Sequence, residues 1–113
     1  MDILSDHQQR LAYRFAHVPL PDDAIACHPW CEYGDDDARR YFLTREWRIG
    51  DIWVEVAGEQ NHRGEVTRWV HVDGEDQLGP LGRVELIAAI VEAGQLYDTL
   101  LTPREVARNR SAR

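Results

Sequence analysis

Residues 41–72 read YFLTREWRIGDIWVEVAGEQNHRGEVTRWVHV, and this stretch decides the fold. β-Branched and aromatic residues are frequent in it, and these residue types favour a pleated, half-buried sheet. Turn residues divide the stretch, so it predicts three antiparallel strands over residues 39–49, 52–57 and 65–72. Gly50-Asp51 is a Gly-X pair, which predicts a two-residue hairpin between the first two strands.

Side-chain alternation along these strands predicts two different faces. The nearly all-apolar core face is expected to hold Tyr41, Leu43, Trp47, Ile49, Ile52, Val54, Val56, Val66, Val70 and Val72. The opposite face is expected to hold Phe42, Thr44, Glu46, Arg48, Trp53, Glu55, Thr67, Trp69 and His71. This second face is amphipathic rather than simply polar.

The second hairpin is expected to set Trp53 directly across from Trp69 on the amphipathic face. Two interpretations stay open. In the first, the N-terminal third of the chain covers both indoles. In the second, they form an exposed aromatic patch, a composition typical of an interface centre. The predicted protein-binding residues are Trp53, Trp69, Arg48, Glu55 and His71.

Two helices are expected on either side of the strands. Ser5 and Gln8 have capping-box spacing, and apolar residues at helical steps predict a helix from Ser5 to Val18. Residues 83–100 form the clearest helical pattern. Its main stripe is Val84, Ile87, Ala88, Val91 and Gly94, widened by Leu86, Ile90, Leu96, Tyr97 and Leu100. We expect this stripe to pack on the Ile52, Val54 and Val70 face of the sheet.

These elements predict one small α+β domain over residues 1–113. Its centre is an antiparallel meander of three strands, or of four, with the long amphipathic helix on one face and the N-terminal helix beside it. The prediction leaves residues 19–37 as an irregular loop. Residues 101–113 are expected to form a frayed basic tail, although Thr102 to Glu105 resembles a helix start.

The composition narrows the classes of partner. The 113 residues include 13 Lys+Arg, all of them arginine, and 20 acidic residues, for a net charge of −7. An acidic body repels phosphate backbones, so direct nucleic-acid binding is disfavoured, whereas a basic protein partner or nucleic-acid mimicry is compatible. The sequence has no apolar run of membrane-spanning length and no signal-peptide pattern, which predicts a cytoplasmic protein without a membrane partner.

Cysteine chemistry is confined to Cys27-His28-Pro29-Trp30-Cys31. Three interpretations of this element stay open: two reduced thiols, a zinc site completed by His28 or other histidines, and a local disulfide. The disulfide is disfavoured in the cytosol, and zinc sites more often have two-residue cysteine spacings. No cofactor is otherwise expected, so zinc bound by Cys27, Cys31 and His28 is the alternative.

The same element, followed by a meander and a long helix, resembles a family of small uncharacterised proteins of actinobacteria and their phages. That family shares a Cys-x-x-Trp-Cys element, matched here by Cys27, Trp30 and Cys31 over a loose pattern spanning residues 25–100. The resemblance implies an α+β fold and a phage-like origin, and it carries no activity. The family tends to have a histidine soon after the second cysteine. Here Glu32-Tyr33-Gly34 follows instead.

The sequence lacks a phosphate-binding glycine loop, a Gly-x-Ser-x-Gly elbow and a His-Glu-x-x-His helix. The leading hypothesis is therefore a non-enzymatic protein-interaction module. It would be encoded by a phage or mobile element and would inhibit a host nucleic-acid-handling protein. The alternatives are a zinc-stabilised accessory domain and a small cysteine enzyme. Self-pairing of an open sheet edge into a homodimer is a further expectation.

Overall fold

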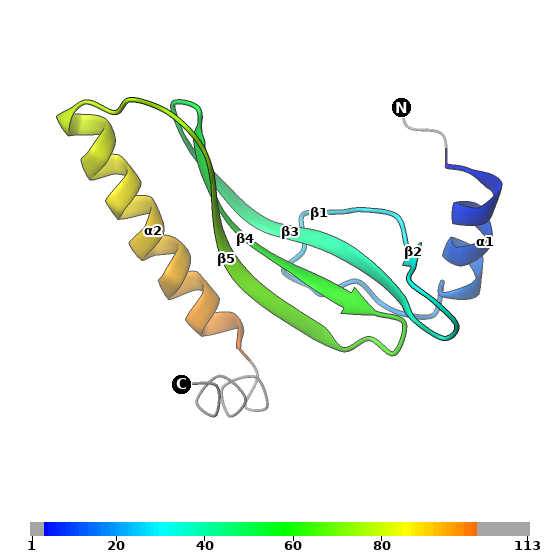
Figure 1. Ribbon diagram of the computed structural model, residues 1–113. Coiled ribbons are helices and arrows are strands. Elements are labelled where there is room, and N and C mark those ends of the chain that lie inside the picture. Colours follow the sequence, from blue (N-terminus) through cyan, green and yellow to red (C-terminus); the bar gives the residue numbers. More distant parts are fainter. Residues whose placement is uncertain (1–3, 102–113) are drawn as a thin grey trace. The chain divides into compact units, whose positions relative to one another are not determined.

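The computed structural model describes residues 4–101, so the predicted tail at 101–113 and the helix start at Thr102 lie almost wholly outside the described residues. The elements follow in the order α1 (Asp6–Arg14), β1 (Ala26–Cys27), β2 (Cys31–Glu32), β3 (Ala38–Ile49), β4 (Ile52–Asn61), β5 (Val66–Gly74) and α2 (Pro80–Leu100) (Figure 1). The fold is α+β, as predicted, with an N-terminal helix, an antiparallel meander and a long C-terminal helix packed against it.

The meander β3-β4-β5 is extended by two short strands. The sheet order is β1-β3-β4-β5, and β2 also pairs with β3. Both short strands are antiparallel to β3, with Cys27 beside Phe42 and Cys31 beside Arg39. They lie in the segment 19–37 that was predicted to be an irregular loop. Strands of two residues carry no readable alternation, so sequence periodicity could not reveal them.

The chain forms two compact units. Of the described residues, the first comprises 4–44 and 58–67, and the second comprises 45–57 and 68–101. In the first unit, a buried cluster joins α1 and its following turn to β3 through Leu11, Phe15, Val18, Trp30 and Ala38. In the second unit, a separate buried cluster joins the sheet to α2 through Ile49, Val54, Val56, Ala89 and Ala93.

The capping box predicted for α1 is present. The Gln8 amide donates to Ser5 Oγ at 3.1 Å, and the Ser5 amide donates to Gln8 Oε1 at 3.0 Å. The helix ends at Arg14, four residues before the predicted end at Val18. The reason is a tighter turn, because the Val18 amide donates to the carbonyl of Phe15. Val18 is nevertheless buried with Leu11.

The prediction of a single core face along β3 is wrong at its first half. Tyr41 is exposed, whereas Phe42, assigned to the opposite face, is 2% exposed. The turn pairs Ile49 with Ile52, but at the far end the His62 amide donates to the carbonyl of Ala38 at 3.0 Å. β3 therefore contains one more residue than β4 between these pairs, a β-bulge that reverses its side-chain alternation.

The β4–β5 register also differs from the prediction. The Asn61 amide donates to the carbonyl of Glu65, which closes a short loop at Gly64, whose φ is +86°. The same register sets Glu55 beside His71 and therefore Trp69 opposite Ala57. Trp53 and Trp69 do not face each other. They lie four residues apart along the sheet, which is roughly 13 Å.

The long helix packs on the predicted sheet face but through a different side. Its contacts with the core cluster come from Ala89 and Ala93, together with the half-buried Leu86, Leu96 and Leu100. Leu86, Leu96 and Leu100 were predicted to widen the packing stripe, and that part of the prediction is confirmed. The predicted main stripe is instead largely exposed, as Val84, Ile87 and Val91 are 64%, 62% and 52% exposed. Alanines present little bulk, which allows a helix backbone to approach a sheet closely.

Candidate interaction surfaces

Trp53 and Arg48 form one end of the predicted sheet-face patch. They lie across from each other at the β3–β4 hairpin, and the Arg48 guanidinium stands 5.0 Å from the centre of the Trp53 ring. Arg48 Nε also donates to Glu46 Oε1 at 2.6 Å. The guanidinium covers part of the indole, so Trp53 is half-buried.

Glu55 and His71 form the next contact of this face. A carboxylate oxygen of Glu55 lies 3.2 Å from His71 Nδ1. Trp69, two residues before His71 on β5, is half-buried. The α2 core cluster takes Val54, Val56 and Val70 from the same strands, so alternation turns the two indoles away from α2. The structure thus places all five predicted residues on one face without a tryptophan pair.

The two cysteines lie on β1 and β2, and both are exposed and free. Cys27 pairs with Phe42 and Cys31 pairs with Arg39. Partners three residues apart on one strand point to opposite faces and lie about 10 Å apart. A disulfide requires Cα atoms within about 7 Å. This arrangement does not favour a disulfide between the two thiols.

Within residues 4–101, no three His, Cys, Asp or Glu side chains converge in a way that could hold a metal ion. His28, the predicted third ligand, is exposed, and its backbone amide donates to the carbonyl of Tyr41. In the same range, no helix is both long and apolar enough to cross a membrane.

A polar cluster surrounds Arg39 on β3. Its guanidinium donates to both carboxylate oxygens of Asp37 at 2.9 Å, lies 3.5 Å from Glu59, and stands 5.0 Å from the centre of the Tyr33 ring. The hydrogen bond with Arg39 holds the pKa of Asp37 below its ordinary value. Hydrogen bonds with Tyr33 and then with Glu59 raise the pKa of Tyr41 to about 12. Arg39 thus holds the carboxylates of Asp37 and Glu59 and the ring of Tyr33 together on this surface.

The outer side of α2 is an exposed apolar surface, although most of its residues were predicted to pack on the sheet. It consists of Leu81, Val84, Ala88 and Val91, at steps of three and four residues, with Ile87 beside them. We call this set the outer stripe. Leu81 is 79% exposed, and Ala88 is exposed too. Helical spacing places the outer stripe opposite Ala89 and Ala93, so α2 is apolar on two opposite sides.

The borders of the outer stripe carry charge. Glu85 and Glu92, seven residues apart, follow one border of the helix, and Arg83 lies on the other. Glu92 Oε2 accepts a hydrogen bond from Trp47 Nε1 at 3.0 Å. Trp47 in turn lies under the Arg45 guanidinium, 4.7 Å from the ring centre. Glu92 of this border is therefore held in place against the sheet.

Comparisons with protein-family models, curated proteins and solved structures give no match to this chain.

Proposed function

We propose that this protein is a non-enzymatic protein-interaction module and that the outer stripe of α2 is its docking surface. The observation that carries the proposal is the exposure of Leu81, Val84, Ile87 and Val91, from 52% to 79%, on a helix whose other side is already buried. A helix that is apolar all round normally has both sides covered. The exposed side chains amount to on the order of several hundred Å², a size that marks binding sites.

The charge along the stripe favours a basic partner. Glu85 and Glu92 border it, and the whole chain carries a net charge of −7. An amphipathic helix with lysine or arginine beside its apolar face would make both interactions. Its apolar face would contact the stripe, and its basic residues would be attracted to the acidic border. Such helices bind in apolar grooves and along apolar faces through residues at helical spacing, and opposite charges increase their association rate.

A second copy of this chain fits the outer stripe less well. If two α2 helices packed antiparallel through Leu81, Val84, Ala88 and Val91, Glu85 and Glu92 would flank the contact on the same side in both copies. Like charges at these flanking positions oppose association. Parallel packing would place Glu92 beside the apolar Ile87 of the other copy. Charge thus selects a basic partner over self-association.

The sheet-face residues Arg48, Trp53, Glu55, Trp69 and His71 are a second surface for the same partner class. Within this class, the acidic charge suits inhibition of a host nucleic-acid-handling protein by a phage or mobile-element product. A target whose natural ligand is a polyanion offers a basic surface, and binding to it weakens steeply as salt is added. Acidic charge also disfavours direct binding of nucleic acid by this chain.

The proposal is tested with three helical peptides that share one apolar stripe and differ only in flanking lysine, glutamine or glutamate. Calorimetry is expected to give tightest binding for the lysine peptide, at least about tenfold tighter than for the glutamate peptide at low salt. Val84→Gln and Ile87→Gln together should remove this binding, since they delete apolar contact without changing charge.

Ile25→Gln is the matched control, because Ile25 is 70% exposed and lies in the other compact unit. This variant should bind the lysine peptide like the original protein. Equal loss in Ile25→Gln would show that the peptide adheres to any exposed apolar residue. No preference among the three peptides would overturn the proposed partner chemistry.

A zinc-stabilised accessory domain is the alternative function. It requires Cys27 and Cys31 to move to a shared ligand set, because they now pair with opposite-facing residues of β3. Metal analysis of the purified protein decides it: one equivalent of zinc that is lost in Cys27→Ser and in Cys31→Ser would support it, and the lack of stoichiometric zinc would eliminate it.

A further inference from the structure

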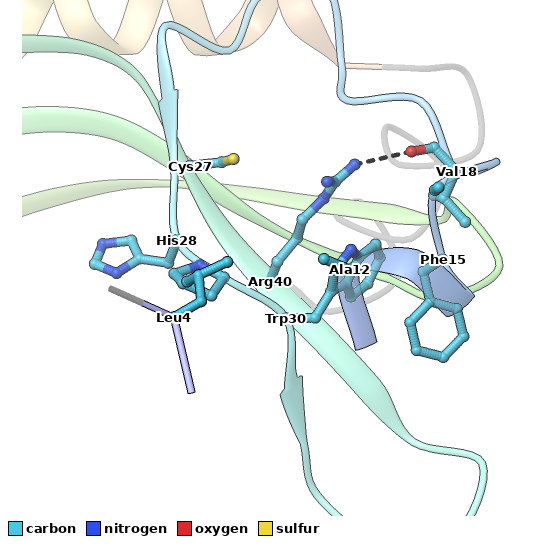
Figure 2. A pocket seen from close by; sticks show the side chains of 10 residues that line it. Leu4, Ala12, Phe15, Val18, Cys27, His28, Trp30 and Arg40 are labelled. Carbon is cyan, nitrogen blue, oxygen red and sulfur yellow. Dashed lines mark hydrogen bonds between the residues drawn. The ribbon is translucent and has the colours of Figure 1, made fainter. Parts of the chain in front are cut away.

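A pocket of about 320 Å³ lies in the first compact unit, and it takes no part in the proposed docking surface (Figure 2). Its walls are mainly apolar, with side chains from α1, from the segment after it and from the β1–β2 connection. The lining includes Leu4, Phe15, Val18, Pro29 and Trp30. Phe15 and Trp30 pack with ring centres 5.1 Å apart, so the walls are preformed. The volume is near the lower end for small-molecule sites, about 300–1,000 Å³.

Arg40 of β3 is the cation of this pocket. Its guanidinium lies 4.5 Å from the centre of the Trp30 ring. Nε donates to Gln60 Oε1 at 2.8 Å, and Nη2 donates to the carbonyl of Val18 at 3.1 Å, the bond drawn in Figure 2. Gln60 Nε2 also donates to the carbonyl of Pro19 at 2.8 Å. These contacts hold the guanidinium in one position.

The partners of Arg40 are all neutral, in contrast to the partners of Arg39 and Arg48. Arg39 and Arg48 contact carboxylates at 2.9 Å and 2.6 Å. Arg40 contacts an amide, a carbonyl and an indole, and no carboxylate within the described residues reaches it. Burial lowers the pKa of Arg40, and coulombic interaction with Cys27 opposes this effect. Arg40 is half-buried, and a bound anion would complement its charge through charge-assisted hydrogen bonds.

From this geometry we infer that the pocket binds a small carboxylate with an apolar or aromatic body. A guanidinium has five N–H donors in a planar fork. Two of them are used by Gln60 and Val18, and the other three, both hydrogens on Nη1 and the second hydrogen on Nη2, have no acceptor among residues 4–101. These donors suit the two oxygens of a carboxylate, whose bonds to a guanidinium are charge-assisted. The apolar body of the ligand would lie against Phe15 and Trp30.

The probe is 3-phenylpropionate, and its uncharged isostere 3-phenylpropionamide is the ligand control. NMR titration of the intact protein follows the Trp30 indole N–H and the Arg40 side-chain N–H groups. The carboxylate is expected to shift both signals saturably, with a dissociation constant on the order of a millimolar for so small a ligand. The amide is expected to bind at least about tenfold more weakly.

Two matched variants separate the pocket from the fold. Cys27 lines the pocket and is exposed, so Cys27→Asp places a competing carboxylate near Arg40 and should weaken 3-phenylpropionate binding at least about tenfold. Cys31 pairs with Arg39, whose side chain lies on the other face of the sheet from that of Arg40. Cys31→Asp therefore adds the same charge and should leave 3-phenylpropionate binding unchanged. Equal binding of acid and amide, equal effects of the two variants, or no saturable shift at Trp30 and Arg40 would each overturn the inference.

Discussion

Gly58 on β4 allows the strand to pass the buried ring of Phe42, and replacing it with alanine tests the core of the first unit. A Cβ atom there would lie 2.5 Å from Phe42 Cζ and 2.8 Å from the carbonyl oxygen of Thr67. Real Cβ atoms do not approach other atoms this closely. Phe42 is 2% exposed, so its ring has no space to move into, and the Thr67 oxygen belongs to the backbone.

The expected cost follows from these contacts. Overpacking a filled core lowers the free energy of unfolding by about 1–3 kcal/mol, and removing a strand glycine returns about 0.5–1 kcal/mol. Gly58→Ala should therefore destabilise the protein by roughly 1–2 kcal/mol, which corresponds to a fall in Tm of about 4–16 °C for a domain of this size. Urea unfolding, followed by circular dichroism and tryptophan fluorescence, measures the change.

Gly94 supplies the matched control. It lies within α2, and a Cβ atom added there would have no neighbour within 4 Å. Gly94→Ala should raise the free energy of unfolding by about 0.5–1 kcal/mol, because alanine restricts the unfolded chain and favours the helix. The same substitution thus has opposite signs at the two positions. A Gly58→Ala variant as stable as the original protein would refute the described packing of β4 on Phe42.

Three further predictions follow from the same contacts. Ala93→Leu should lower the free energy of unfolding by about 1–3 kcal/mol in urea denaturation, because Ala93 is 0% exposed. Ile87→Gln on the outer stripe should change this free energy by less than about 0.5 kcal/mol. Similar losses in both variants would contradict the assignment of a buried and an exposed side to α2. Ser5→Ala should cost about 1 kcal/mol through loss of the capping box, measured by the same assay, and an unchanged midpoint would mean that the cap contributes nothing. Ultraviolet titration should show a phenol that ionises near pH 12 and is missing in Tyr41→Phe. Because the folded pKa of Tyr41 is raised to about 12, its stabilising effect is complete below pH 10 and is lost between about pH 10 and 12; a titration without this late phenol would disprove the Tyr33 and Glu59 contacts.

The parts of the fold that the sequence predicted are those with strong local signals. The Gly50-Asp51 turn, the Ser5–Gln8 capping box and the helical repeat of residues 83–100 each depend on near neighbours, and each is present. The bulge in β3 could not be predicted, because it depends on how two strands pair and has no distinctive residue. It moved Phe42 into the core and Tyr41 to the surface.

Sequence periodicity also could not predict which side of α2 packs on the sheet. Val84, Ile87 and Val91 repeat at helical spacing as regularly as Leu86, Ala89 and Ala93, so the pattern offers two stripes and does not rank them. The larger side chains suggested the core, but the alanines allow closer approach to the sheet. The prediction of a Trp53–Trp69 pair is wrong for a related reason. The β4–β5 loop sets the register of the two strands, and a change of register changes every pair of facing residues.

The outer stripe is the centre of the functional account, and methyl NMR of the protein with the lysine-flanked peptide tests it most directly. We expect saturable shifts of the methyl groups of Val84, Ile87 and Val91. Saturable shifts at the Trp53 and Trp69 indoles with unmoved α2 methyl groups would contradict this account.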